Sequence, residues 1–165
     1  MFSHGRRPCH LQYDVVVDTR WVTREAHVAG FIGRRAVGIT ISARKGRWLM
    51  DGADVTGVAD AIDLDLGFTP STNQIVVRRL SLRIGQAGDA PAAYLRFPEM
   101  ALVRLPQTYR RTGARMYCYA APSVGYRAKL TVDGDGAIVR YPGLFTRLPP
   151  SGQRGRRDPE TDGRR

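Results

Sequence analysis

Residues 37–44 read Val-Gly-Ile-Thr-Ile-Ser-Ala-Arg, and apolar side chains alternate with small or polar ones along the whole stretch. Successive side chains of a β-strand point to opposite faces of a sheet, so this period of two predicts a strand with one buried face. Residues 62–68, Ile-Asp-Leu-Asp-Leu-Gly-Phe, repeat the alternation and predict a second strand of the same kind. Strands with one apolar and one polar face are typical of antiparallel sheets.

Most of the remaining chain has the same texture, since short runs rich in Val, Ile, Thr and aromatic residues are separated by Gly, Pro and Asp. Residues 69–73 around Pro70 are predicted to be a loop. Asp-Gly-Asp-Gly at 133–136 predicts a hairpin turn, and residues 53–61 a short helix. Such a sheet must curl to cover its apolar face, so we predict a mainly β fold, a curved antiparallel roll or open barrel with at most one or two short helices. Further strands are predicted at 12–19, 22–31, 74–84, 92–105, 108–121, 126–132 and 137–141.

Length and composition predict a single domain, because 165 residues, of which 42% are apolar, suffice for one core. We expect residues 1–10 to be a flexible N-terminus, residues 11–148 the β domain, and the Arg-rich residues 149–165 a disordered tail. The sequence contains no apolar run of about 20 residues. It also has no apolar stretch after Arg6 and Arg7, so we expect no secretory signal and a cytoplasmic protein.

The formal net charge of +11 could indicate a nucleic-acid partner. The Arg residues of the body are scattered singly or in pairs and form no long basic stripe, so we do not expect nucleic acid to be the ligand. A basic surface that binds nucleic acid or anionic lipid stays open as an alternative, and the Arg-rich ends would favour peripheral contact with an anionic membrane. No cofactor or metal is expected, because Cys9, Cys118 and the three histidines lack ligand spacing. The two cysteines are predicted to be free thiols.

Several motifs occur in a consistent order along the chain: WLMDG at 48–52, IDLDLGFTP at 62–70, TN at 72–73, VRRL at 77–80, Tyr109, VDGDG at 132–136 and YPGLF at 141–145. Through them the chain resembles the bacterial family called putative glycolipid-binding, over residues 11–145. The resemblance implies a spiral β-roll related in shape to periplasmic lipoprotein carriers, and an amphiphilic ligand, a glycolipid by the family's name. Compared with that family, the chain before Tyr13 is short of an opening hairpin.

A polar cluster is predicted around Arg78, which would lie on the apolar face of its strand. An Arg in such a place needs an acidic partner or an anionic ligand. Asp63 and Asp65, two residues apart on one face of the preceding strand, are the nearest candidates, with Thr72 and Asn73 in the joining loop. The cluster either holds a sugar or phosphate head group or is an ion-pair network that pins a hairpin, and the residue pattern favours the second interpretation.

Aromatic side chains are candidates for the wall of a ligand cavity, because rings stack on sugars and accommodate acyl chains, although core packing explains most of them. The candidates are Trp21, Trp48, Tyr109, Tyr117, Tyr119, Tyr126 and Tyr141. Trp48 and Tyr141 lie beside the family-like motifs. The predicted ligand-binding set is therefore Trp48, Asp63, Asp65, Thr72, Asn73, Arg78 and Tyr141.

A glycan-active hydrolase that uses Asp63 and Asp65 as acid and base is the enzymatic alternative. Carboxyl groups two residues apart on a strand lie ~6–7 Å apart at the backbone, which leaves the retaining geometry open. This spacing fits any amphipathic strand, and the chain has no G-x-S-x-G motif. We therefore predict a binding protein and not an enzyme, with the apolar part of an amphiphile buried in the concave face of the roll.

Overall fold

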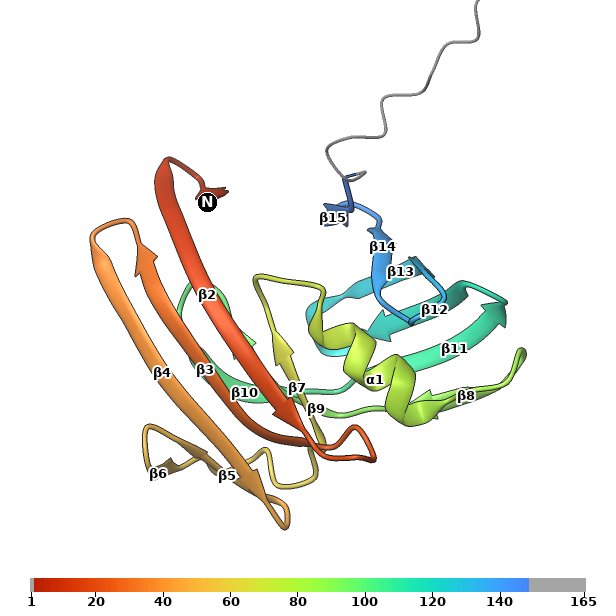
Figure 1. Cartoon of the computed structure of the whole chain (residues 1–165), viewed down its shortest axis with the longest axis horizontal. Helices are drawn as coiled ribbons and strands as arrows, with labels where there is room; N and C mark the ends of the chain where they lie inside the picture. The colour runs from red at the N-terminus through yellow and green to blue at the C-terminus, as the bar shows by residue number, and fades with distance from the viewer. Residues whose placement is uncertain (1, 149–165) are drawn as a thin grey trace, which may run out of the picture.

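The computed structural model describes residues 2–148 and arranges them in three β-sheets and one α-helix (Figure 1). The N-terminal sheet has six strands in chain order, and each strand is antiparallel to the next. In Figure 1 it forms one side of the molecule, with the long strands β2, β3 and β4 beside one another. Its strands are β1 (Phe2–His4), β2 (Arg7–Val17), β3 (Thr23–Ile32), β4 (Arg35–Arg44), β5 (Arg47–Met50) and β6 (Ala53–Asp54).

Strand β4 shows the predicted alternation. Ile39, Ile41 and Ala43 are buried, while Gly38 and Thr40 are exposed and Ser42 is half-buried. The buried residues pack in the first of two core clusters, which also takes in side chains from β3, β5 and the middle sheet. The prediction of a strand with one buried face is therefore confirmed for this segment.

The folded part of the chain begins nearer to the N-terminus than the sequence analysis predicts. Residues 2–4 pair with residues 7–9 in a hairpin, with Phe2 opposite Cys9. The prediction that residues 1–10 are a flexible N-terminus is thus wrong for residues 2–10, which lie in this hairpin and in the strand that continues from it. The segment is polar and charged, but an edge strand pairs through main-chain groups that every residue except proline carries in full. The predicted tail at 149–165 lies outside the described residues.

The C-terminal sheet forms the other side of the molecule in Figure 1. Its six antiparallel strands are ordered β15-β14-β13-β12-β11-β8. The predicted hairpin turn at 133–136 is confirmed: Asp133 Oδ1 accepts hydrogen bonds from the N–H groups of Asp135 (3.0 Å) and Ala137 (2.9 Å). The strands are β8 (Ala87–Asp89), β11 (Thr108–Gly113), β12 (Met116–Ala121), β13 (Tyr126–Val132), β14 (Ile138–Tyr141) and β15 (Phe145–Thr146).

A small middle sheet, ordered β10-β9-β7, lies between the two larger sheets in Figure 1. It consists of β7 (Asp63–Leu66), β9 (Ala92–Arg96) and β10 (Ala101–Leu105), and β7 runs parallel to β9. Leu64 and Leu66 have no exposed surface, and neither has Asp63. The sequence analysis predicts one buried face for this segment, but strand β7 is buried on both. The crossover between the parallel strands covers its second face.

The crossover contains the helix α1 (Thr72–Leu80), where the sequence analysis predicts a strand over 74–84. The β-branched run Ile75-Val76-Val77 favours a strand by propensity, but all three residues are buried, and Val76 and Val77 pack in the second core cluster against the C-terminal sheet. The helix ends at Ser81, whose N–H donates to the Val77 carbonyl at 3.2 Å. The predicted short helix at 53–61 is also wrong, since β6 and two turns occupy that segment.

The predicted fold class is confirmed: the structure is mainly β, its sheets are curved and largely antiparallel, and they do not close into a barrel. Helical structure in residues 2–148 is limited to α1 and the 3-10 turn η1 (Pro122–Val124). Neither is long and apolar enough to cross a membrane.

An ion pair attaches α1 to the middle sheet. Arg79 donates two hydrogen bonds to Asp63, from Nε to Oδ1 (2.7 Å) and from Nη2 to Oδ2 (2.5 Å). The side chain of Asp63 is fully buried, and that of Arg79 is only 15% exposed. Burial raises the pKa of the Asp63 carboxyl, and Arg79 opposes this rise. The geometry is bidentate, so the pair fixes both the position and the orientation of the helix.

Substitution Arg79→Met should lower the free energy of unfolding by about 3–5 kcal/mol, because it leaves the Asp63 charge buried without a partner. The neighbouring Arg78→Met is the matched control. Arg78 pairs with Asp135 at the surface, where the two side chains are 38% and 84% exposed, and its loss should cost about 1 kcal/mol or less. Urea denaturation measures both values, and equal costs for the two variants would contradict the assignment.

Candidate functional site

A cavity of about 640 Å³ is bounded by the C-terminal sheet, the loop after β7 and the N-terminal hairpin. Its volume lies within the range of ~300–1,000 Å³ that is usual for ligand pockets. Most of the wall is apolar or aromatic, with polar groups from Asp65 and Asn73. The rings that line it are Phe2, Phe68, Tyr94, Phe97, Tyr119, Tyr126, Tyr141 and Phe145.

The loop at 67–70 forms one wall of the cavity. A Cβ on Gly67 would lie 2.7 Å from the Tyr94 hydroxyl oxygen, so any larger residue there would displace the tyrosine. On the other side, the Tyr13 hydroxyl of β2 hydrogen-bonds to Thr69 Oγ1 (3.0 Å) and Ser71 Oγ (2.9 Å). The loop is thus held between the N-terminal sheet and the tyrosine at the cavity wall.

Asp65 is the acidic residue of the cavity wall. The Gln107 amide nitrogen donates a hydrogen bond to its Oδ2. Burial raises the pKa of the Asp65 carboxyl to about 6, the Gln107 hydrogen bond opposes the rise, and the nearby Asp63 charge adds to it. The other amide atom, Gln107 Oε1, is buried and has no hydrogen-bond partner among residues 2–148. The Asp65–Gln107 pair is therefore only partly satisfied.

Tyrosine hydroxyl groups surround this carboxyl. Burial raises the pKa values of Tyr109, Tyr119 and Tyr141, and the Asp65 charge adds to each rise. These phenols are therefore neutral at physiological pH and can serve as hydrogen-bond donors or acceptors. Asn73 Nδ2 donates to the Tyr109 hydroxyl at 2.6 Å, which fixes the Asn73 side chain at the cavity wall.

The structure brings three of the seven predicted ligand-binding residues together at the cavity: Asp65, Asn73 and Tyr141. Trp48 lies in the first core, where its Nε1 donates to the Ala61 carbonyl at 3.1 Å. Thr72 is buried, and its Oγ1 accepts a hydrogen bond from the Leu66 N–H at 3.2 Å. Neither Trp48 nor Thr72 lines the cavity. The remaining two, Asp63 and Arg78, also lie outside it.

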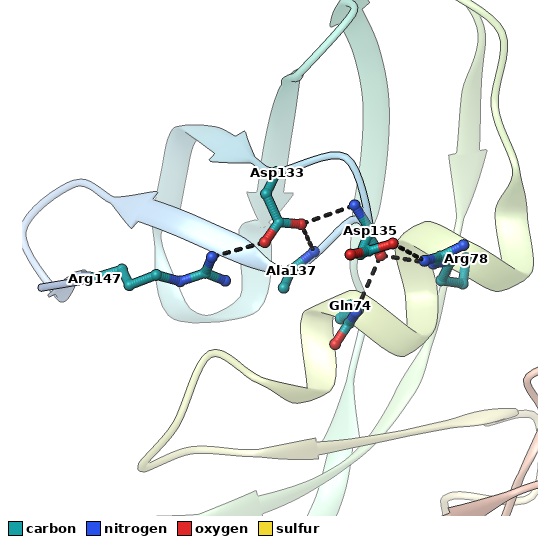
Figure 2. Close-up of polar contacts among 6 residues, drawn as sticks. All are labelled: Gln74, Arg78, Asp133, Asp135, Ala137 and Arg147. Atoms are coloured by element: carbon teal, nitrogen blue, oxygen red, sulfur yellow. Dashed lines mark hydrogen bonds and ion pairs between the residues drawn. The ribbon is translucent and has the colours of Figure 1, made fainter. Parts of the chain in front are cut away.

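Arg78 does not pair with Asp63 or Asp65, contrary to the sequence analysis. Its Nε donates to the main-chain carbonyl of Asp135 (2.6 Å) and its Nη2 to Oδ1 of the same residue (3.1 Å), as Figure 2 shows. Gln74 of α1 donates to the same carbonyl (3.0 Å). The prediction assumed the period of a strand, whereas adjacent residues of a helix point about 100° apart, so Arg79 and not Arg78 reaches Asp63. Arg78 and Gln74 attach α1 to the turn at 133–136.

Several residues of the wall were not predicted. Phe68 lies within the IDLDLGFTP motif, so that motif could have indicated it. Phe2, Tyr94 and Phe97 carry no such signal, because their places at the cavity depend on how three sheets meet. Among residues 2–148, no three His, Cys, Asp or Glu side chains lie close enough together to hold a metal ion.

Comparison with known proteins gives two matches. Residues 1–147 match the model of the family described as putative glycolipid-binding. The fold is similar to the crystal structure of a Pseudomonas aeruginosa protein described as a member of the DUF1089 family, with 30% sequence identity and a TM-score of 0.81. That similarity covers 88% of this chain and 82% of the other. No match was found among the curated proteins.

The Asp65 carboxyl should destabilise the folded protein near neutral pH. Its folded pKa of about 6 lies above the usual value of 3.8, so folding is favoured when the group is protonated, and this advantage is lost as the pH rises through about 6. Substitution Asp65→Asn should therefore raise the free energy of unfolding at pH 7.5, by about 1–3 kcal/mol. The gain should vanish near pH 4, and parallel urea titrations at the two pH values measure it. A loss of stability at pH 7.5 would show that the charged carboxylate is structurally required.

Proposed function

The chain belongs to the putative glycolipid-binding family, and on this basis we propose that it binds an amphiphile of the glycolipid type in the aromatic cavity and catalyses no reaction. The observation that carries the proposal is the distribution of polarity along the cavity. Asn73, Tyr119 and Tyr141 are buried, whereas Val124 and Leu144 are 59% and 68% exposed. The buried polar groups thus lie at the inner end, and exposed apolar side chains lie at the mouth together with the exposed Ser3 and His4.

This arrangement suits a molecule with a polar head and an apolar chain. Asp65, Asn73 and the tyrosine hydroxyls offer hydrogen bonds to sugar hydroxyl groups, and the tyrosine rings can stack on sugar C–H faces. The chain would leave through the mouth over Val124 and Leu144. Burial of apolar surface there contributes roughly 25 cal/mol per Å².

The geometry of the two aspartates supports binding without catalysis. A glycosidase needs two carboxyl groups on either side of the scissile bond. Asp63 is fully buried, does not line the cavity and has both oxygens bound by Arg79. Only Asp65 of the pair can therefore meet a ligand in this cavity.

The double substitution Val124→Asp, Leu144→Asp should weaken the binding of octyl glucoside about tenfold, or 1.4 kcal/mol, because it places charge where the alkyl chain leaves the cavity. Isothermal titration calorimetry measures the dissociation constant. Both side chains are exposed, so the melting temperature should not change.

Ile84→Asp is the matched control, because Ile84 is 63% exposed and does not line the cavity. It should bind octyl glucoside as the unsubstituted protein does. Failure of the unsubstituted protein to bind octyl glucoside, or equal weakening by the control, would overturn the proposed binding mode.

We propose in addition that the mouth of the cavity touches an anionic membrane surface while the amphiphile is exchanged. Phe2, Val124, Leu144 and Phe145 supply exposed apolar surface at the mouth, and the chain carries a net charge of +11. Clustered exposed apolar residues are typical of surfaces that meet a partner or a membrane.

In vesicle co-sedimentation, the protein should bind vesicles containing phosphatidylglycerol more strongly than pure phosphatidylcholine vesicles, because cationic surfaces gain about 1 kcal/mol for each basic residue near an anionic membrane. The Val124→Asp, Leu144→Asp variant should sediment less with both kinds of vesicle. No preference for the anionic vesicles, or no effect of the variant, would remove the membrane contact from the proposal.

A further inference from the structure

The two aspartates of β7 differ in their partners. Asp63 has an arginine on both of its oxygens, whereas the one hydrogen bond that the described residues give to the Asp65 side chain comes from the neutral amide of Gln107. That bond occupies Oδ2, and Oδ1 has no partner within residues 2–148. A partly buried carboxylate without a cation is costly, and Asp65 retains this cost at a cavity wall.

The charge of the cavity is opposite to that of the molecule. The chain carries 26 Lys and Arg residues against 15 Asp and Glu. None of those 26 is among the residues that line the cavity, where Asp65 is the acidic residue and His4 of the β1 edge is the one group that can become positive. A phosphate or sulfate group at the inner end would meet the Asp65 carboxylate without a compensating arginine, so the cavity disfavours anionic head groups.

Aromatic rings line the same cavity as Asp65. Tyr119, Tyr126 and Tyr141 contact one another, with ring centroids 5.6–6.1 Å apart, and all three line the cavity. Aromatic rings attract a cation within about 6 Å of the ring centroid, and the attraction is strongest where water is excluded. Rings around a lone carboxylate are the recognition chemistry of an ammonium group.

We infer that the inner end of the cavity binds a primary ammonium group of the amphiphile, which donates hydrogen bonds to Asp65 Oδ1 and lies among the tyrosine rings. The inference rests on the proposed function and names its ligand class: a single amino-bearing head, whether an amino sugar or a simple alkylamine, on an apolar chain. The ammonium group would give the Asp65 carboxylate a cationic partner, as Arg79 does for Asp63.

The pH dependence follows from the groups around Asp65. The titratable groups that act on it or respond to it are Asp63 on its own strand and the tyrosines Tyr94, Tyr109, Tyr119 and Tyr141 on β9, β11, β12 and β14, and none of these carries positive charge. Protonation of Asp65 removes the partner of the ammonium group. Preference for the ammonium ligand should therefore be present at pH 7.5 and decline as the pH falls through about 6.

The sharpest probes are octyl glucoside and octyl 2-amino-2-deoxyglucoside, which differ by one amino group, together with octylammonium. Calorimetry at pH 7 should give at least about tenfold tighter binding for the amino glycoside than for the neutral one. Substitution Asp65→Asn should remove this preference, so that the variant binds the two glycosides with affinities within about twofold of each other. Asp60→Asn is the matched control, since it removes the same charge from an exposed residue that does not line the cavity.

The net charge of +11 repels cations from the protein as a whole, so non-specific attraction cannot produce the preference. Equal binding of the two glycosides, or a preference that survives Asp65→Asn, overturns the ammonium site while leaving the proposed function intact. If neither glycoside binds, both the ammonium site and the proposed function are overturned.

If Asp65→Asn does not fold, the pH dependence of the His4→Gln protein tests the site instead. Its preference for the amino glycoside should still decline between pH 7.5 and pH 5, and a constant preference overturns the inference. Octylammonium separates the two sources: tight binding of it shows that the amino group alone suffices, and binding of only the amino glycoside shows that the sugar is also required.

Discussion

The burial of β7 on both faces is the constraint on which the rest of the structure depends. A strand in this position that begins with an aspartate needs a cation from the element that covers it, and Arg79 of α1 is that cation. The pair fixes the helix over the middle sheet. The same helix then carries Asn73 to the cavity and reaches the turn at 133–136 through Arg78. One buried ion pair thus ties α1 to the middle sheet, and α1 in turn packs against the C-terminal sheet.

Asp63 and Asp65 show how one strand can hold the same residue type in two different environments. Asp63 is fully buried and Asp65 is partly buried, and burial raises the pKa of both carboxyls. Two hydrogen bonds from Arg79 replace the water that the Asp63 carboxylate loses on burial. Asp65 has a neutral amide, and a second amide atom, Gln107 Oε1, is itself left without a partner among the described residues. Incomplete satisfaction of polar groups is unusual in a folded core and is typical of positions where function sets the requirement.

The sequence predicted what depends on local periodicity and missed what depends on how distant segments meet. Residues 37–44 revealed their strand because one face is buried and the other is not. The run at 75–77 suggested a strand because three β-branched residues follow one another. In the structure all three are buried, and a helix between two layers can also carry such an apolar run. The error in secondary structure then carried over to the site, since the period of a strand selected Arg78 as the partner of the aspartates. Asp65, Asn73 and Tyr141 were found through motifs, but no local pattern marks Gln107 as the partner of Asp65.

The size of the cavity limits what it can enclose. A volume of about 640 Å³ is sufficient for a sugar-sized head group and the first part of a chain, but not for a complete glycolipid with long acyl chains. In the proposed binding mode, the remainder of the chain would lie outside, along the exposed side chains of Val124, Leu144 and Phe145. In water that part would stay exposed to solvent, so binding of a long-chain amphiphile is most favourable where another apolar phase or partner covers it. In the proposed binding mode, the inner end would select the head group, and the exposed apolar side chains at the mouth would pass the chain on to a neighbouring apolar surface.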